Sequence, residues 1–98
     1  MELNKAFGQA LKRSRMTAGL TQEDFSTVSS RTYLSALERG LQSPTLEKLA
    51  AICELLGAHP VTLVAATYLA KEDMSVEELL RTLTEELGTM GFLPPEPR

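Results

Sequence analysis

The sequence contains only one cysteine and one histidine in 98 residues. A lone cysteine cannot form a disulfide within the chain, and one histidine cannot make a metal cluster. We therefore expect no metal and no cofactor. Cys53 is interpreted as a small core residue, and His59, just before Pro60, as a loop or capping residue.

Long apolar runs are also missing. A helix that spans a bilayer needs about 20 consecutive apolar residues, and the apolar stretch at 60–70 is too short. Residues 1–5 lack the basic start and apolar stretch of a signal peptide. These two observations predict a cytoplasmic protein without a membrane segment.

Catalytic patterns are scarce as well. The chain has no Ser/His/Asp set, no metal-ligand spacing and no glycine loop suited to cradle phosphates. It also has no internal repeat and no low-complexity tract. We expect a binding protein rather than an enzyme.

Enough apolar sequence is present for one compact domain, because hydrophobic residues make up 43% of the chain. The net charge of −3 is unevenly distributed. Residues 1–48 carry seven basic and five acidic side chains, whereas residues 49–98 carry three and eight. The first half is therefore suited to face an anionic partner, with the acidic half directed away from it.

Apolar side chains recur at helical spacing, which predicts an all-α protein. The first helix covers about residues 3–18, the third 31–39 and the fifth 60–71. Three residues that favour the N-cap precede the second, third and fourth helices, and Gly40 closes the third in a left-handed conformation. The capping residues are Thr21, Ser30 and Thr45. The expected inward-facing residues are Leu3, Phe7, Ala10, Leu11, Ala18, Phe25, Val28, Leu34, Leu37, Leu46, Leu49, Ile52, Cys53 and Leu56.

A sixth helix begins at a capping box, with Ser75 at the cap and Glu78 three residues later. Four apolar residues on one stripe are expected to form a dimer interface, and Met90 continues the stripe. The alternative is that this helix folds back over its own domain, with the dimer formed by the fifth helix. The four stripe residues are Val76, Leu80, Leu83 and Leu87.

Three segments resemble those of a known family and follow one another in the family's order. They are residues 20–25 (LTQEDF), 33–40 (YLSALERG) and 43–49 (SPTLEKL). The chain resembles the Cro/C1-type helix-turn-helix family over about residues 7–64. The resemblance implies a lambda repressor-like five-helix DNA-binding domain over 1–72. An extra C-terminal helix over 73–91 and a Pro-rich tail over 92–98 follow. In this family the third helix enters the major groove of DNA.

The resemblance also implies a DNA-binding site. Residues 31, 32, 35 and 36 fall where the family reads bases, while Tyr33 is open to either a phosphate contact or the edge of the core. Lys12 and Arg13 are open to either a solvated face or a phosphate contact. The residues that the resemblance assigns to DNA are Gln22, Ser30, Arg31, Thr32, Tyr33, Ser35, Ala36, Arg39, Gln42 and Ser43.

Two further features follow from the same resemblance. Arg15 and Glu38 match a buried salt bridge between the first and third helices. The chain departs from the family because only eight residues separate Gln22 from Arg31, about two fewer than usual, and the usual turn glycine is absent. The first residue in the groove is therefore left open among Ser29, Ser30 and Arg31.

The sequence thus predicts a sequence-specific transcriptional regulator, a repressor or autoregulator that binds a palindromic operator as a homodimer. Such a protein would lie in the cytoplasm at the nucleoid. The alternative is an antitoxin, whose acidic C-terminal half binds a toxin as its protein partner.

Overall fold

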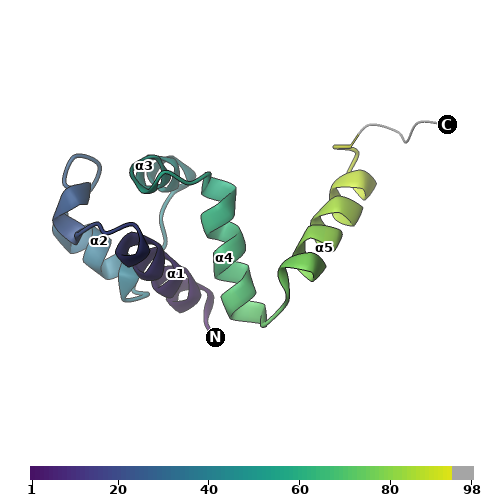
Figure 1. Cartoon of the computed structure of the whole chain (residues 1–98), viewed down its shortest axis with the longest axis horizontal. Coiled ribbons are helices and arrows are strands. Elements are labelled where there is room, and N and C mark those ends of the chain that lie inside the picture. The colour runs from purple at the N-terminus through teal and green to yellow at the C-terminus, as the bar shows by residue number, and fades with distance from the viewer. Residues whose placement is uncertain (94–98) are drawn as a thin grey trace.

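The computed structural model describes residues 1–93, and over that range it contains helices and no strand. The all-α prediction is confirmed. Of the expected Pro-rich tail, Pro94, Pro95 and Pro97 lie outside the described residues. The elements in chain order are α1 (Leu3–Thr17), the 3₁₀ helix η1 (Gln22–Phe25), α2 (Arg31–Glu38), α3 (Leu46–Leu56), α4 (Pro60–Glu72) and α5 (Val76–Thr89), shown in Figure 1.

Side-chain caps fix where these helices begin. The Oγ of Ser30 accepts the backbone N–H of Tyr33 at 3.0 Å, and the Nδ1 of His59 accepts that of Val61 at 3.1 Å. Each cap satisfies a donor that the first turn leaves without a partner, and removing one costs about 1 kcal/mol. The four caps expected from the sequence are confirmed at Thr21, Ser30, Thr45 and Ser75.

Because the connection between Gln22 and Arg31 is short, the second helical element is also short. η1 is a single turn that ends at Phe25. Val28, expected on the buried side of this helix, lies in the turn after it. The N–H groups of Val28 and Ser29 both donate to the Phe25 carbonyl at 3.0 Å, which closes the segment before α2 begins.

A single apolar core joins α1, η1, α2, α3 and α4. Burial of each large apolar side chain contributes about 1.5–3 kcal/mol. Three residues expected to face inward, Leu3, Ala18 and Leu46, are instead exposed. Leu46 is 84% exposed because it is the first residue of α3, which begins at the edge of the core. The largest fully buried side chains are Phe25, Leu11, Leu34, Leu37, Ile52 and Cys53.

Over residues 1–93, no single helix is long and apolar enough to cross a bilayer. The pair α3 and α4 reaches that length and composition only when taken together, across a bend of 99°.

α5 stands apart from the core. Figure 1 shows it leaving the end of α4 and extending away from the other helices, so that α4 and α5 form a V. None of its residues is buried. The alternative in which this helix folds back over its own domain is therefore not the arrangement seen here. The chain turns between the two helices at Asp73, whose φ of 51° is left-handed.

Candidate nucleic-acid interface

The face of α2 opposite the core is polar and open. Leu34 and Leu37 point inward and are fully buried. Because residues three and four apart share a helix face, the opposite side presents a row of polar side chains of which all but the half-buried Ser35 are exposed. That row consists of Arg31, Thr32, Ser35 and Arg39, the last at the C-cap of the helix.

The other expected contact residues are placed less uniformly. Ser30, Gln42 and Ser43 are exposed, while Gln22 and Tyr33 are half-buried. Ala36 is only 7% exposed. The expectation that Ala36 reads a base is therefore corrected, because its side chain is buried.

The two arginines on this face carry no carboxylate partner within residues 1–93, where the ion pair of the structure joins Arg15 to Glu38. Arg31 is the first residue of α2, at the positive end of the helix dipole. A cation is unfavourable at that end unless an anion is nearby. The polar face of α2 therefore combines hydroxyl groups with two guanidinium groups, those of Arg31 and Arg39, that are suited to bind an anion.

A buried network holds α2 against the rest of the domain. Arg15 donates to Glu38 through Nε at 2.6 Å and through Nη2 at 3.0 Å. Its Nη1 also donates to the carbonyl of Leu20 at 2.9 Å. The two side chains are 11% and 4% exposed, and the hydrogen bonds to Glu38 raise the pKa of Arg15 against the opposing effect of burial. The network thus joins α1, the loop after it and the end of α2.

Gln22 belongs to the same network. Its Nε2 donates to the Oε1 of Glu38 at 3.1 Å, which ties the first residue of η1 to the last residue of α2. One hydrogen of an amide nitrogen serves this bond, and the second stays free to donate elsewhere. The two helical elements that flank the turn are therefore fixed to each other by side chains.

Two residues that position α2 were missed from the sequence. An ideal Cβ on Gly8 would lie 2.5 Å from the carbonyl oxygen of Glu38, so only glycine lets α1 approach α2 this closely. The Nζ of Lys48 donates to the carbonyl of Val28 at 2.6 Å. Both contacts join segments distant in sequence, and no local pattern marks them.

A short first helical element, a tight turn and a second helix with an exposed polar face define a helix-turn-helix DNA-binding protein. Comparison with known proteins agrees. The model of the helix-turn-helix domain family matches residues 6–66. An uncharacterized HTH-type transcriptional regulator of Sinorhizobium fredii, y4dJ, is 41% identical over 69 residues, which cover 68% of this chain and 90% of that protein.

Solved structures give the same result. One crystal structure of the clp gene regulator ClgR from Corynebacterium glutamicum is 32% identical, with a TM-score of 0.66, over 71% of this chain and 92% of that one. A second is 28% identical, with a TM-score of 0.65, over 95% and 98%.

The chain belongs to the helix-turn-helix domain family and is of the Cro/C1 type that its motifs indicated. It is a transcriptional regulator that binds DNA. The relatives matched here are regulators of this kind rather than enzymes.

Proposed function

We propose that this regulator reads a specific palindromic operator as a homodimer, with α2 in the major groove. The observation that carries the proposal is the exposed polar face of α2, formed by Arg31, Thr32, Ser35 and Arg39. The major groove admits an α-helix and presents a distinct hydrogen-bonding pattern for each base pair. Hydroxyl and guanidinium groups can read that pattern.

The residues on this face divide into two roles. Thr32 and Ser35 lie on the middle of the face and read base edges. Arg31 enters the groove with the first turn of α2, beside the cap at Ser30. Arg39 lies at the other end of the helix and binds the phosphate backbone. Base contacts determine which sequence is bound, whereas phosphate contacts fix the orientation of the protein on the DNA.

Backbone contacts extend to either side of α2. Gln42 and Ser43 are exposed in the loop before α3 and donate to phosphate. Gln22 uses the free hydrogen of its amide, since the other is held by Glu38. Tyr33 is half-buried, and its hydroxyl is the group that we assign to phosphate. Lys12 and Arg13 are exposed on α1, and we assign them to solvent.

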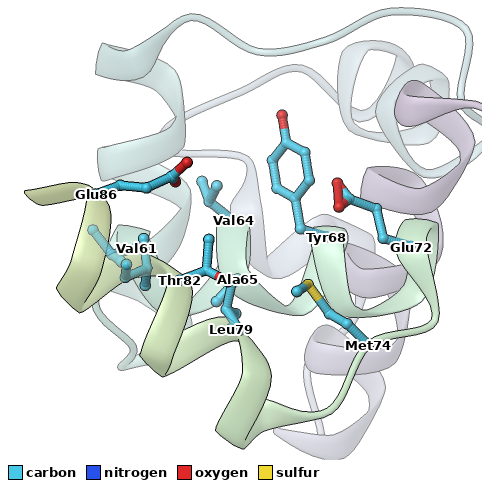
Figure 2. A pocket seen from close by; sticks show the side chains of 10 residues that line it. Val61, Val64, Ala65, Tyr68, Glu72, Met74, Leu79, Thr82 and Glu86 are labelled. Carbon is cyan, nitrogen blue, oxygen red and sulfur yellow. The ribbon is translucent and has the colours of Figure 1, made fainter.

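We further propose that residues 1–72 form the DNA-binding domain and that residues 73–91 join two copies. The V between α4 and α5 encloses an apolar groove of about 440 Å³. Figure 2 shows side chains from both helices turned toward this space, among them Val61, Val64 and Leu79. A groove and a stripe that nothing covers in one chain favour a second copy as the cover.

The stripe on α5 continues this apolar surface, since Leu83 also lines the groove. Val76 and Leu80 are 52% and 58% exposed, and Leu83 and Leu87 are each exposed by more than a third. Burial of these four side chains in a dimer stabilises it by the hydrophobic effect. Two copies then hold their α2 helices roughly 34 Å apart, the spacing of successive major grooves on one face of DNA.

A dimer seated across two major grooves excludes other proteins from the same stretch of DNA. We therefore propose that the regulator represses, including at its own promoter, and that it acts at the nucleoid in the cytoplasm. A reporter gene placed behind a selected operator tests the direction of control. Lower expression with the protein than without it is the expected result.

Selection from a pool of random duplex DNA tests the operator directly. The wild-type protein should enrich one palindrome, and light scattering should give the mass of two chains, both free and on that DNA. Enrichment of no sequence would overturn the specificity. A single-chain mass on the DNA would overturn the dimer.

An antitoxin role is the second candidate, because α5 presents several exposed carboxylates beside its apolar stripe. Glu77, Glu78, Glu85 and Glu86 all lie on α5 and are exposed. A basic toxin would be complementary to this surface. Purification of the protein together with the product of a neighbouring small gene would favour this role.

A further inference from the structure

Lys48 is placed where a lysine is not expected. It occupies the first turn of α3, and its backbone N–H donates to the cap at Thr45. A cation in the first turn of a helix faces the positive end of the helix dipole, which is unfavourable. Contacts of the side chain outside α3 can offset this cost.

The ammonium of Lys48 finds that compensation outside its own helix. The side chain is half-buried, and its Nζ donates to the carbonyl oxygen of Val28 at 2.6 Å. The same Nζ lies 5.7 Å from the centre of the Tyr33 ring, within range of a cation–π interaction. One cation thus contacts both sides of the short connection that leads into α2.

Both of these contacts bear on the geometry of α2. Val28 is the last residue before the Ser29–Ser30 step, and Tyr33 lies in the first turn of α2, where its N–H is capped by Ser30. The Tyr33 ring and the Val28 side chain also pack against the core. A bond at Val28 fixes where the chain enters α2, and a contact with the ring of Tyr33 fixes the rotation of α2 about its axis.

Rotation about the axis decides which side chains reach the bases. Successive residues of an α-helix lie about 100° apart around its axis. A rotation of α2 by a fraction of that angle therefore moves Thr32 and Ser35 away from the base edges. We propose that Lys48 is a positioning residue for DNA recognition, which sets sequence specificity through Val28 and Tyr33 without touching a base. The proposal rests on the proposed function of α2 in the major groove.

Lys48→Met tests this assignment, because methionine keeps an apolar stem of similar length and removes the charge. Binding is measured on the operator selected by the wild-type protein and on a random duplex of equal length. We expect about a tenfold loss on the operator and less than a twofold loss on the random duplex. Lys48→Arg should recover most of the loss, because a guanidinium also donates to a carbonyl and stacks on an aromatic ring.

Lys71→Met is the matched control. Lys71 is also a half-buried lysine, but it lies in the last turn of α4, away from α2 (Figure 1). The substitution removes the same charge and should leave the ratio of operator to random binding unchanged.

Tyr33 provides an independent arm of the experiment. Tyr33→Leu removes the ring and should lower the same ratio. Tyr33→Phe keeps the ring and removes only the hydroxyl that we assign to phosphate, so it should weaken binding to both DNAs to a similar degree. In the double variant Lys48→Met/Tyr33→Leu the two losses should not multiply, because residues that act through one contact are not additive.

Three outcomes would overturn the proposal. Equal losses on both DNAs, with a salt slope lower by about one unit, would make Lys48 a phosphate contact. A lower melting temperature with an unchanged ratio would make it a structural residue only. If the losses multiply in the double variant, Lys48 and Tyr33 act independently, and Lys48 does not position α2 through the Tyr33 ring. If the wild-type protein selects no operator, the proposed function itself fails, which is a different result from these three.

Discussion

Gly8 and Glu38 bring the backbones of α1 and α2 into direct contact. A Cβ on Gly8 would lie 2.5 Å from the carbonyl oxygen of Glu38, and 2.6 Å from that of Leu37. Backbone atoms inside a helix cannot swing aside as the end of a side chain can. We therefore expect Gly8→Ala to lower the free energy of unfolding by about 3 kcal/mol, as overpacking does in a dense core. Urea unfolding measures the change.

Gly88 offers the matched control, since it also lies inside a helix. A Cβ there would meet only the Cδ1 of Leu93, at an ordinary 3.7 Å. Gly88→Ala should be neutral or should stabilise α5 by up to about 1 kcal/mol, through helix propensity alone. Equal behaviour of the two variants would mean that the close approach at Gly8 relaxes without cost.

Removal of Arg15 leaves Glu38 as a charge with little access to water. Arg15→Met should therefore cost about 3–5 kcal/mol, whereas Arg15→Met/Glu38→Leu should cost less, because no charge is left behind. The raised pKa of Arg15 means that its contribution is complete below the ordinary range of arginine and does not change between neutral and mildly alkaline pH. Thermal melts of both variants decide the point, and wild-type stability in the single variant would contradict it.

Thr32 and Ser35 should govern sequence preference. Replacing either with alanine is expected to cost about 1–3 kcal/mol on the selected operator and much less on random DNA. Thr17→Ala, at the end of α1, is the control for loss of an exposed hydroxyl. Equal losses on the two DNAs would exclude base contacts by these residues.

Arg39 should act on every DNA sequence alike. Arg39→Ala should weaken operator and random binding to a similar degree, and a salt titration should give a slope smaller by about one unit, because one fewer phosphate is neutralised. Arg81→Ala, on α5, should leave the slope unchanged. A wild-type slope in the Arg39 variant would place this residue off the DNA.

Leu80 is the residue of the stripe that leaves the most apolar surface in water among the four. Leu80→Glu should convert the dimer to a folded monomer with weak operator binding, as judged by light scattering and circular dichroism. Met16→Glu is the control, because Met16 is 61% exposed on α1, outside the stripe. A tight dimer in the Leu80 variant would place the interface elsewhere.

Local signals in the sequence predicted most of the fold. Caps such as Ser30 and Ser75 act on the backbone next to them, so the helix starts could be placed without knowledge of the tertiary structure. The apolar spacing of Leu34 and Leu37 likewise identified the inner face of α2. The outer face followed from it, with Ala36 as the exception, because its side chain is buried although its spacing places it beside Thr32.

Contacts between distant segments could not be predicted in the same way. In the sequence alone, Gly8 is indistinguishable from any other glycine in a helix, because its close contact is with α2. Lys48 likewise has the pattern of a solvated charge, because its contacts with Val28 and Tyr33 exist only in the folded chain. The exposure of Leu46 has the same origin, since the spacing of apolar residues does not reveal where the core ends.

The left-handed turn at Asp73 sets the direction in which α5 leaves α4, so a small change of angle there is amplified along the length of α5. α5 has 14 residues and is about 21 Å long at 1.5 Å per residue. A swing of about 10° at this turn moves the far end of α5 by about 4 Å, close to the 3.4 Å step along one DNA strand. For the proposed dimer joined through α5, we therefore expect the angle at this turn to set which spacing between the operator halves is preferred. In that proposed dimer, the distance between the two half-sites depends on a turn that lies outside the proposed reading helix α2.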